Sequence, residues 1–555
     1  MVFELISWIY ISIICLIWGN GFVRLIFRGG VNISELDLPV LCFVGLSVIG
    51  VVSLYLSLFI PLNGWVKGIL QVPVLLYFLS SSNRITFFNQ VKNAFAKLAP
   101  TDRFLLIAGI VMLLFLSSSP VIHPDSLNYH IYSIQIFNKY GMIRGIANLQ
   151  PELGFQSLWF GVMSVFDLSF FQPAVSYPLS ACVLCWFIIF LVSGSVTRGA
   201  RAEAGIPAFW YLALLIFAFV SWTQVRLTAS SASPDFIVSL CLLLSFYFFT
   251  RKALPGEVEF PLFFALFFAV IAISIKLSAI FIILLPAYVL VYGAVTKKFF
   301  LVRSGLLLIT LFLAPVIARN IISAGYPLYP SAFADVFHGD WKPDESKLIL
   351  FRHYITDYAR YPVSRSVAEG AYAASFQDWL PVWWRHLYII DKIMMLLIVC
   401  GGLADLILLR KWLKNFTARR AAAFVISLTG AVCWFINAPD PRFGTGFLLP
   451  LIYFQYAPFL ISGKQWFYKI TGIVKFSFTL LIVTYIVYRG IYFFHPGQLI
   501  FPEGIKESRP ASADCRYKIK RMLFRDSAGQ AGIADSCRTF IFRGSSLKEG
   551  FKPAE

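Results

Sequence analysis

Charged side chains are scarce in this sequence: aspartate, glutamate, lysine and arginine make up 14% of its 555 residues, and histidine occurs 6 times. A soluble enzyme would carry more charge, because charged residues normally make up about a quarter of a globular chain. Hydrophobic residues instead reach 59%, phenylalanine alone occurs 56 times, and the mean hydropathy is +0.75. The composition therefore indicates a polytopic membrane protein.

The sequence also lacks an internal repeat and any group of cysteine and histidine residues at the spacing of zinc ligands. The first absence argues against a transporter, because transporters are commonly built from repeated halves. The second argues against a zinc site. We therefore expect no metal and no other cofactor, although the sequence does not exclude a divalent cation.

The formal net charge of +19 does not predict nucleic acid binding, because the basic residues lie mostly in short loops between apolar runs. These near-continuous apolar runs predict helices, since the strands of a membrane barrel would alternate in polarity. About fourteen runs have roughly the length needed to span a bilayer, so the expected fold is an all-α polytopic membrane protein. The predicted spans are 3–18, 38–61, 64–80, 104–118, 172–194, 207–225, 235–250, 258–275, 278–295, 303–318, 386–410, 421–437, 444–463 and 470–493.

Loops rich in lysine and arginine stay in the cytoplasm, and this rule orients the predicted spans. The alternation requires that the apolar run 155–170 does not cross the membrane. That run is short and contains Asp167, so we expect it to be re-entrant or interfacial. Both termini then face outward, together with four loops. These outward loops are 119–171, 226–234, 319–385 and 438–443.

We divide the chain into three regions. Residues 1–103 form accessory spans and a cytoplasmic loop, residues 104–494 form the catalytic membrane region with outward loops 119–171 and 319–385, and residues 495–555 form an outward tail. No cleavable signal peptide is expected, so the first apolar run is a span. In the tail, Cys515 and Cys537 form a disulfide in one interpretation and remain free thiols in the other.

The most informative segment is HPDSLNYH, from His123 to His130, just after the apolar run 104–118. Ionisable residues at a membrane are costly and commonly functional. Asp125 can cap a helix from Ser126 to Asn138, whose apolar side chains recur at helical spacing. We therefore expect an interfacial helix there. The alternative role for Asp125 is that of a helix cap only.

Two further residues of this segment are candidates for the site. Tyr129 follows Asp125 by four positions and stays on its helical face, so it is a candidate for substrate binding. His130 is a candidate catalytic residue that orients the substrate, and its alternative role is to cap a polar rim.

Basic residues are uncommon at outward span ends, yet the sequence has several there, and together they predict an anion site. They are Arg226, Lys276, Arg319 and Arg442. Lys276 divides two apolar runs at the membrane boundary, where a lipid phosphate would lie, and snorkelling without a ligand is its alternative. Arg442 lies in the rigid turn PDPRFG, where simple pairing with Asp440 is the alternative.

Asp235 follows Ser233 and Pro234 at the predicted start of a span. Ser233 suits an N-cap, Pro234 the first helical position, and the charge of Asp235 favours the helix dipole. This structural account is sufficient, and substrate binding by Asp235 is the second interpretation.

A carboxylate beside basic side chains suits sugar transfer from a polyprenyl-phosphate carrier to a hydroxyl group. A phosphate leaves as a stable anion that cations hold, while the acceptor hydroxyl needs one general base. Hydrolysis of a glycosidic bond would require an acid as well. Asp125 is therefore our candidate general base for an inverting transfer that requires no metal in principle.

The stretch from His123 to Phe160, which continues as NKYGMIRGIANLQPELGFQSLWF, resembles the first outward loop of GT-C-type membrane glycosyltransferases. It resembles more closely a group of uncharacterised bacterial multi-pass proteins of that type. The similarity extends to GYPLYP at 325–330 and to the PDPRFG turn. The resemblance implies a GT-C-like fold, Asp125 as catalytic base and basic residues that hold the donor phosphate. One departure is that three predicted spans precede the one that leads into this loop.

The expected enzyme is thus a glycosyltransferase of the bacterial inner membrane, with its active site facing the periplasm. Its partners would be a polyprenyl-phosphate-linked sugar donor, a glycan, lipid or protein acceptor, and the bilayer. Two alternatives remain. An O-antigen polymerase or ligase would rely on arginine and histidine without an essential loop carboxylate, and a non-catalytic envelope-assembly protein would need none of these residues for chemistry.

Overall fold

The computed structural model describes most of the chain, namely residues 1–27, 37–96, 98–171, 176–197, 222–251, 260–361, 374–407, 417–460, 464–492, 494–503, 541–542 and 551–552. Within these ranges the ordered elements are helices, apart from one antiparallel pair of two-residue strands, β1 (Ile541–Phe542) and β2 (Phe551–Lys552). The prediction of an all-α fold is confirmed.

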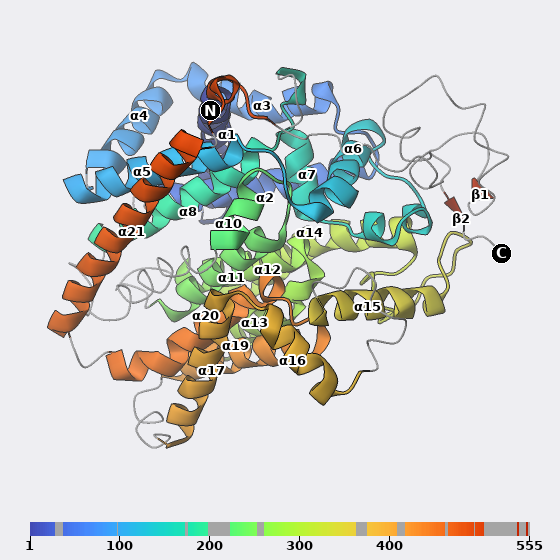
Figure 1. Cartoon of the computed structure of the whole chain (residues 1–555). Helices are drawn as coiled ribbons and strands as arrows, with labels where there is room; N and C mark the ends of the chain where they lie inside the picture. Colours follow the sequence, from blue (N-terminus) through green and yellow to red (C-terminus); the bar gives the residue numbers. More distant parts are fainter. Residues whose placement is uncertain are drawn as a thin grey trace.

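Figure 1 shows the helices and their arrangement in space. In chain order they are α1 (Val2–Phe27), α2 (Leu38–Ser57), α3 (Gly64–Leu79), α4 (Ser81–Ala96), α5 (Pro100–Ser117), α6 (Ile131–Lys139), α7 (Leu158–Val165), α8 (Pro178–Thr197), α10 (Trp222–Ala229), α11 (Asp235–Thr250), α12 (Phe260–Ile275), α13 (Leu284–Val295), α14 (Phe299–Ala324), α15 (Glu345–Arg360), α16 (Phe376–His386), α17 (Ile389–Ile407), α19 (Ala418–Asn437), α20 (Pro441–Leu460) and α21 (Lys464–Tyr492). A π-helical turn, Ser126–His130, precedes α6, and 3₁₀ segments cover Ile146–Asn148, Pro151–Gly154, Ser169–Phe171, Leu277–Ile283 and Pro496–Leu499.

Among the described residues, 6 helical segments are long and apolar enough to cross a membrane: α1, α2, α5, Leu277–Val295, α14 and α19. Each coincides with a predicted span. Other predicted spans form shorter helices, such as α3, α11 and α12 with 16 residues each. The predicted span 207–225 lies mostly outside the described residues. The structure therefore supports a helical membrane protein, and the total of about fourteen spans stays a prediction.

Helix α12 lies in the interior of the bundle, where every one of its residues is buried. Its sequence, FPLFFALFFAVIAISI, is apolar on all sides, so only other helices or lipid can cover it. Helices α11 and α14 pack beside α12, and α20 packs on the far side of α11. The ends of these central helices carry the charged residues described below.

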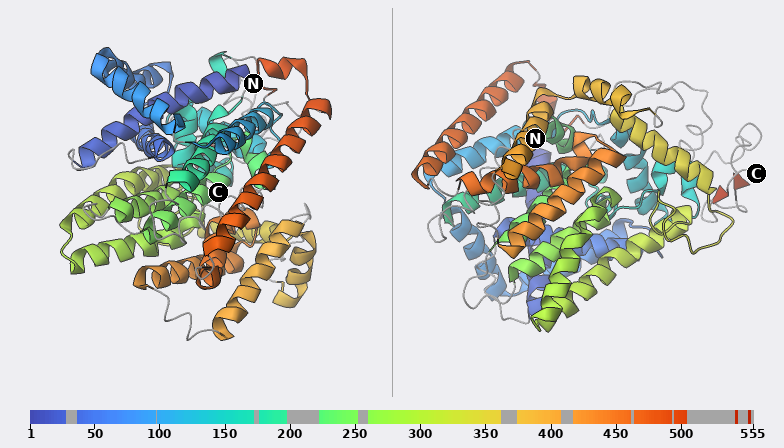
Figure 2. Two further views of the ribbon diagram at one scale, coloured as in Figure 1. Left: turned by 90° about the vertical axis from the view of Figure 1, so that its left-hand side faces the viewer. Right: turned by 90° about the horizontal axis from the view of Figure 1, so that it is seen from below.

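The hydrophobic core is continuous from the N-terminal helices into the middle of the chain. One cluster of buried side chains includes residues of α1 and α2 together with residues of α8, α11, α12 and α14. The N-terminus also meets the segment after α21, because the Met1 amine donates to the Gln498 carbonyl at 2.6 Å. Helix α21, the red helix in Figure 2, runs beside α5. Residues 1–103 therefore share their core with the rest of the bundle.

The apolar run 155–170 contains α7, a helix of 8 residues. Helix α7 is too short to cross a bilayer, which takes about 20 residues. It lies buried against α2 and α6. This geometry agrees with the expectation that the run does not span the membrane.

Helices α1 and α2 approach so closely that their backbones touch. A Cβ atom on Gly19 would lie 2.0 Å from the Leu41 carbonyl oxygen, and one on Gly45 would lie 1.8 Å from that of Cys15. Small residues at such a crossing permit the tight packing that holds membrane helices together. These two glycines therefore fix the α1–α2 contact.

We predict that Gly19→Ala lowers the melting temperature of the detergent-solubilised protein, because the added methyl forces α1 and α2 apart at a cost of about 1–3 kcal/mol or more. The matched control is Gly21→Ala on the same helix, where an added Cβ meets nothing within 4 Å. Equal melting temperatures for the two variants would contradict the close contact.

Candidate functional site

Asp125 lies at the start of the helical segment within loop 119–171, which the sequence predicts to face outward. A helix forms there as predicted, but its first turn, Ser126–His130, is π-helical, and α6 begins at Ile131. Asp125 itself has helical backbone angles and makes no side-chain capping hydrogen bond. The prediction that Asp125 caps this helix is therefore wrong, and its carboxylate is available to the groups in front of it.

Asp235 and Lys276 form an ion pair at the ends of two central helices. Asp235 is the first residue of α11, where its charge favours the positive end of the helix dipole, and Ser233 accepts a hydrogen bond from its backbone. Lys276 directly follows α12 in an extended conformation. Because α11 and α12 pack side by side, the start of one helix meets the end of the other, and their charged residues pair.

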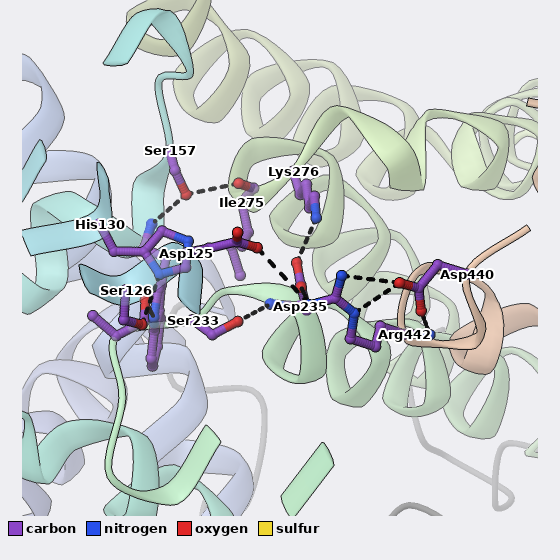
Figure 3. Close-up of polar contacts among 12 residues, drawn as sticks. Asp125, Ser126, His130, Ser157, Ser233, Asp235, Ile275, Lys276, Asp440 and Arg442 are labelled. Carbon is purple, nitrogen blue, oxygen red and sulfur yellow. Dashed lines mark hydrogen bonds and ion pairs between the residues drawn. The ribbon is translucent and has the colours of Figure 1, made fainter. Parts of the chain in front are cut away.

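Arg442 brings the third chain segment to this cluster. The carboxylate of Asp440 accepts hydrogen bonds from the backbone amide and from Nε of Arg442, both at 2.9 Å. The remaining guanidinium nitrogen NH1 lies 3.8 Å from Asp125 and 4.0 Å from Asp235. Figure 3 shows Arg442 between Asp440 and Asp235, with Lys276 beside Asp235 and Asp125 on the opposite side. The structure thus brings four of the predicted residues together, namely Asp125, Asp235, Lys276 and Arg442.

Two tryptophans hold the turn that carries Asp440 and Arg442. The indole of Trp383, on α16, donates to the Pro439 carbonyl at 2.6 Å, and that of Trp434, at the end of α19, donates to the Asp440 carbonyl at 2.7 Å. Both side chains are buried. A buried hydrogen bond fixes its acceptor because breaking it would leave the carbonyl unsatisfied. The direction of Arg442 is therefore set by the packing of α16 and α19.

The short helix α7 links loop 119–171 to the ends of α11 and α12. Ser157, its N-cap, donates to the carbonyl of Ile275 at 2.7 Å, immediately before Lys276. Trp159 donates its indole N–H to the carbonyl of Ala232 at 3.2 Å, three residues before Asp235. The buried helix α7 therefore positions both members of the ion pair.

Tyr129 and His130 lie in the π-helical turn that follows Asp125, and both are buried. The ring of His130 packs 4.3 Å from that of Tyr129, and its Nδ1 hydrogen bonds with the Ser126 hydroxyl at 2.9 Å. Burial lowers the pKa of His130 well below its usual range, and burial together with the charge of Asp125 raises the pKa of Tyr129. Burial therefore favours the uncharged form of both rings, and His130 also packs against Phe160, with ring centroids 5.4 Å apart.

The structure places the two other predicted basic residues elsewhere. Arg319 is fully buried, where it donates to Gln156, to Ser57 at 2.6 Å and to the Gly141 carbonyl, with Phe137 stacked on its guanidinium at 3.8 Å. These contacts tie α14 to α2 and to the first outward loop. Arg226 has an exposed side chain on α10 and lies near α21, where its charge acts on Tyr485. Neither belongs to the charged cluster.

The side chains of the cluster differ in their exposure to solvent. The side chain of Asp125 is 34% exposed and that of Lys276 26%, whereas Asp235 is 8% exposed. Asp125 is therefore the carboxylate that an incoming molecule would meet first. When Asp440 is included, the cluster contains three carboxylates and two basic side chains, so its formal charge is minus one.

Sequence reasoning gave little weight to His123 and treated Asp440 only as an alternative partner for Arg442. His123 is 1% exposed, and its ring lies 5.5 Å from that of His130. It also belongs to a group of three residues, with Asp125 and Asp235, that could hold a metal ion. The signal for His123 was its place in the HPD sequence, whereas nothing in the sequence linked Trp383 to the PDPRFG turn.

One comparison with known proteins gives a match: the model of a family described as a domain of unknown function (DUF8201) covers residues 1–449. No curated protein and no solved structure matches the chain. The matched range contains the whole charged cluster and leaves out the last part of α20 and everything after it.

We predict that Trp383→Phe loosens the turn that carries Arg442. The variant leaves the buried Pro439 carbonyl unpaired at a cost of about 1–3 kcal/mol, so the amides of Arg442 and Phe443 should exchange hydrogen roughly 5- to 150-fold faster. Trp384→Phe is the matched control, because Trp384 is the next residue in the sequence and is 37% exposed. Unchanged exchange in Trp383→Phe would show that the turn is held by other contacts.

Proposed function

The chain belongs to the family described as a domain of unknown function (DUF8201), and from its charged cluster we propose that it is a membrane glycosyltransferase. In this proposal it moves a sugar from a polyprenyl-phosphate carrier to a hydroxyl group of a glycan, lipid or protein. Asp125 acts as the general base. The observation that carries the proposal is the approach of Arg442 to Asp125, at 3.8 Å, within a cluster that also holds Lys276.

Asp125 has the properties that a general base for a hydroxyl group requires. Its carboxylate is the most exposed of the cluster and accepts no hydrogen bond from the described residues. An acceptor hydroxyl could therefore reach it without displacing a protein donor. Removal of a proton by a positioned base typically contributes about 10²- to 10⁴-fold to a rate.

Lys276 and Arg442 keep donors for a phosphate although both already pair with carboxylates. Lys276 has three N–H donors and pairs with one oxygen of Asp235. Arg442 uses Nε and NH2 on Asp440, while its NH1 lies beyond hydrogen-bonding distance of Asp125 and Asp235. Charge-assisted hydrogen bonds from these donors would stabilise a departing phosphate.

The helix ends that meet at the cluster support an outward location for the site. The start of α11, the end of α12 and the start of α20 all lie there, and the positive-inside rule assigns the same side to each of them. The donor phosphate of a membrane lipid would lie at this depth. The proposal accordingly includes a location in the bacterial inner membrane, with Asp125 on the periplasmic side.

We predict that Asp125→Asn abolishes sugar transfer without loss of folded protein, because asparagine keeps the shape of the side chain but cannot take up the proton. The test is a mass-spectrometric survey of lipids and glycans in a deletion strain that carries the wild-type gene, Asp125→Asn or the control Glu345→Gln. Glu345 is exposed on α15 and does not belong to the cluster.

The glycan or glycolipid that disappears on deletion should return with the wild type and with Glu345→Gln, but not with Asp125→Asn. Its return with Asp125→Asn at the wild-type level would refute the general base. A deletion that changes no glycan or lipid would refute the glycosyltransferase and favour a non-catalytic role in envelope assembly. Equal amounts of all three proteins in the membrane are checked by immunoblot.

A further inference from the structure

His123 is a buried polar side chain without a partner for one of its nitrogens. The residue is 1% exposed, and its Nδ1 has no hydrogen-bond partner among the described residues. A buried polar group left unpaired is costly. The general base proposed above gives this histidine no task.

The ring of His123 lies beside two carboxylates from different parts of the chain. One of its nitrogens, one oxygen of Asp125 and one oxygen of Asp235 all lie within 4.8 Å of one another. Asp125 comes from the first outward loop and Asp235 from the start of α11. A cation centred among three such atoms could reach each of them after side-chain movements of about 1 Å or less, because metal–ligand bonds are about 2.0–2.5 Å long.

We propose that His123, Asp125 and Asp235 bind a divalent transition-metal ion of the Mn²⁺ or Zn²⁺ class. One imidazole and two carboxylates form a mixed nitrogen and oxygen set, which suits these ions better than Ca²⁺ or Mg²⁺, whose sites are built from oxygen alone. Three protein ligands leave further coordination positions open, and Asp125, 34% exposed, is itself accessible to solvent.

The ion pairs of the cluster leave carboxylate oxygens for this ion. Lys276 binds one oxygen of Asp235, and the other oxygen lies 4.0 Å from Arg442, so it makes no hydrogen bond to that arginine. The described charges also favour a cation, since Asp125, Asp235 and Asp440 outnumber Lys276 and Arg442 by one. With a divalent ion the cluster would carry a charge of plus one, which suits an anionic ligand such as a phosphate.

The test measures metal binding directly, so it does not depend on any sugar transfer. Purified full-length protein in detergent, treated with a chelator and desalted, is titrated with Mn²⁺ while the signal of free Mn²⁺ is followed by electron paramagnetic resonance. Competition with Zn²⁺ and Mg²⁺ ranks the ions. The variants are His123→Gln, Asp125→Asn and Asp235→Asn, with Glu345→Gln as the control, and gel filtration confirms that each one is folded.

We expect saturable binding to the wild type and to Glu345→Gln, displacement by Zn²⁺ more readily than by Mg²⁺, and at least about tenfold weaker binding in each ligand variant. Asp125 is partly exposed, so Asp125→Asn tests the site even where a change of a buried ligand prevents folding. Absence of saturable binding to the wild type, or equal affinity in His123→Gln or Asp125→Asn, would overturn the metal site. Asp125→Asn removes a proposed ligand and the proposed base together, whereas His123→Gln removes a ligand only. Because Mn²⁺ binding is measured without sugar transfer, a failure of the metal site is distinguished from a failure of the proposed transfer reaction.

Discussion

The pair formed by Asp440 and Arg442 is the interaction on which the charged cluster depends. A guanidinium at the start of α20 is unfavourable by itself, because the helix dipole places positive charge there. Asp440 compensates for it with hydrogen bonds to the backbone and to the guanidinium, and Trp383 fixes the turn from outside. Arg442 is thereby held with one nitrogen facing Asp125 and Asp235. The proposed functions of the cluster depend on this orientation of the guanidinium.

The sequence predicted the helical elements, because apolar length is a local property, while the side of the membrane on which each loop lies stays a prediction from loop charge. Asp125, Asp235, Lys276 and Arg442 were each assigned to an outward helix end, and residues at the same depth of a bundle are the ones that can meet. However, two residues at the same depth in the bundle do not necessarily meet. Arg319 was assigned to an outward end in the same way, but the rotation of α14 about its axis turns it toward Ser57 and Gln156. Sequence periodicity does not specify which neighbour a uniformly apolar helix faces.

Two further features depend on contacts between distant segments. The π-helical turn changes the angular spacing of the residues after Asp125, and its members Tyr129 and His130 are buried against the aromatic ring of Phe160. The bond from Trp383 to Pro439 joins α16 to a turn 56 residues away. Neither the π-helical turn nor this hydrogen bond can be predicted from the local sequence pattern. The role of Asp125 as a cap was inferred from local pattern alone, and the helical backbone at that position excludes it.

The proposed base, the two basic side chains and the proposed metal ligands share one small region, and the central proposal is that this region receives the phosphate of a lipid carrier. The most direct measurement is a cryo-electron microscopy structure of the protein in lipid nanodiscs with a short-chain polyprenyl phosphate. We expect density for the phosphate within hydrogen-bonding distance of Lys276 and Arg442, with Asp125 open to the periplasmic side. A phosphate bound elsewhere on the protein, or a cluster that faces the cytoplasmic leaflet, would contradict the account.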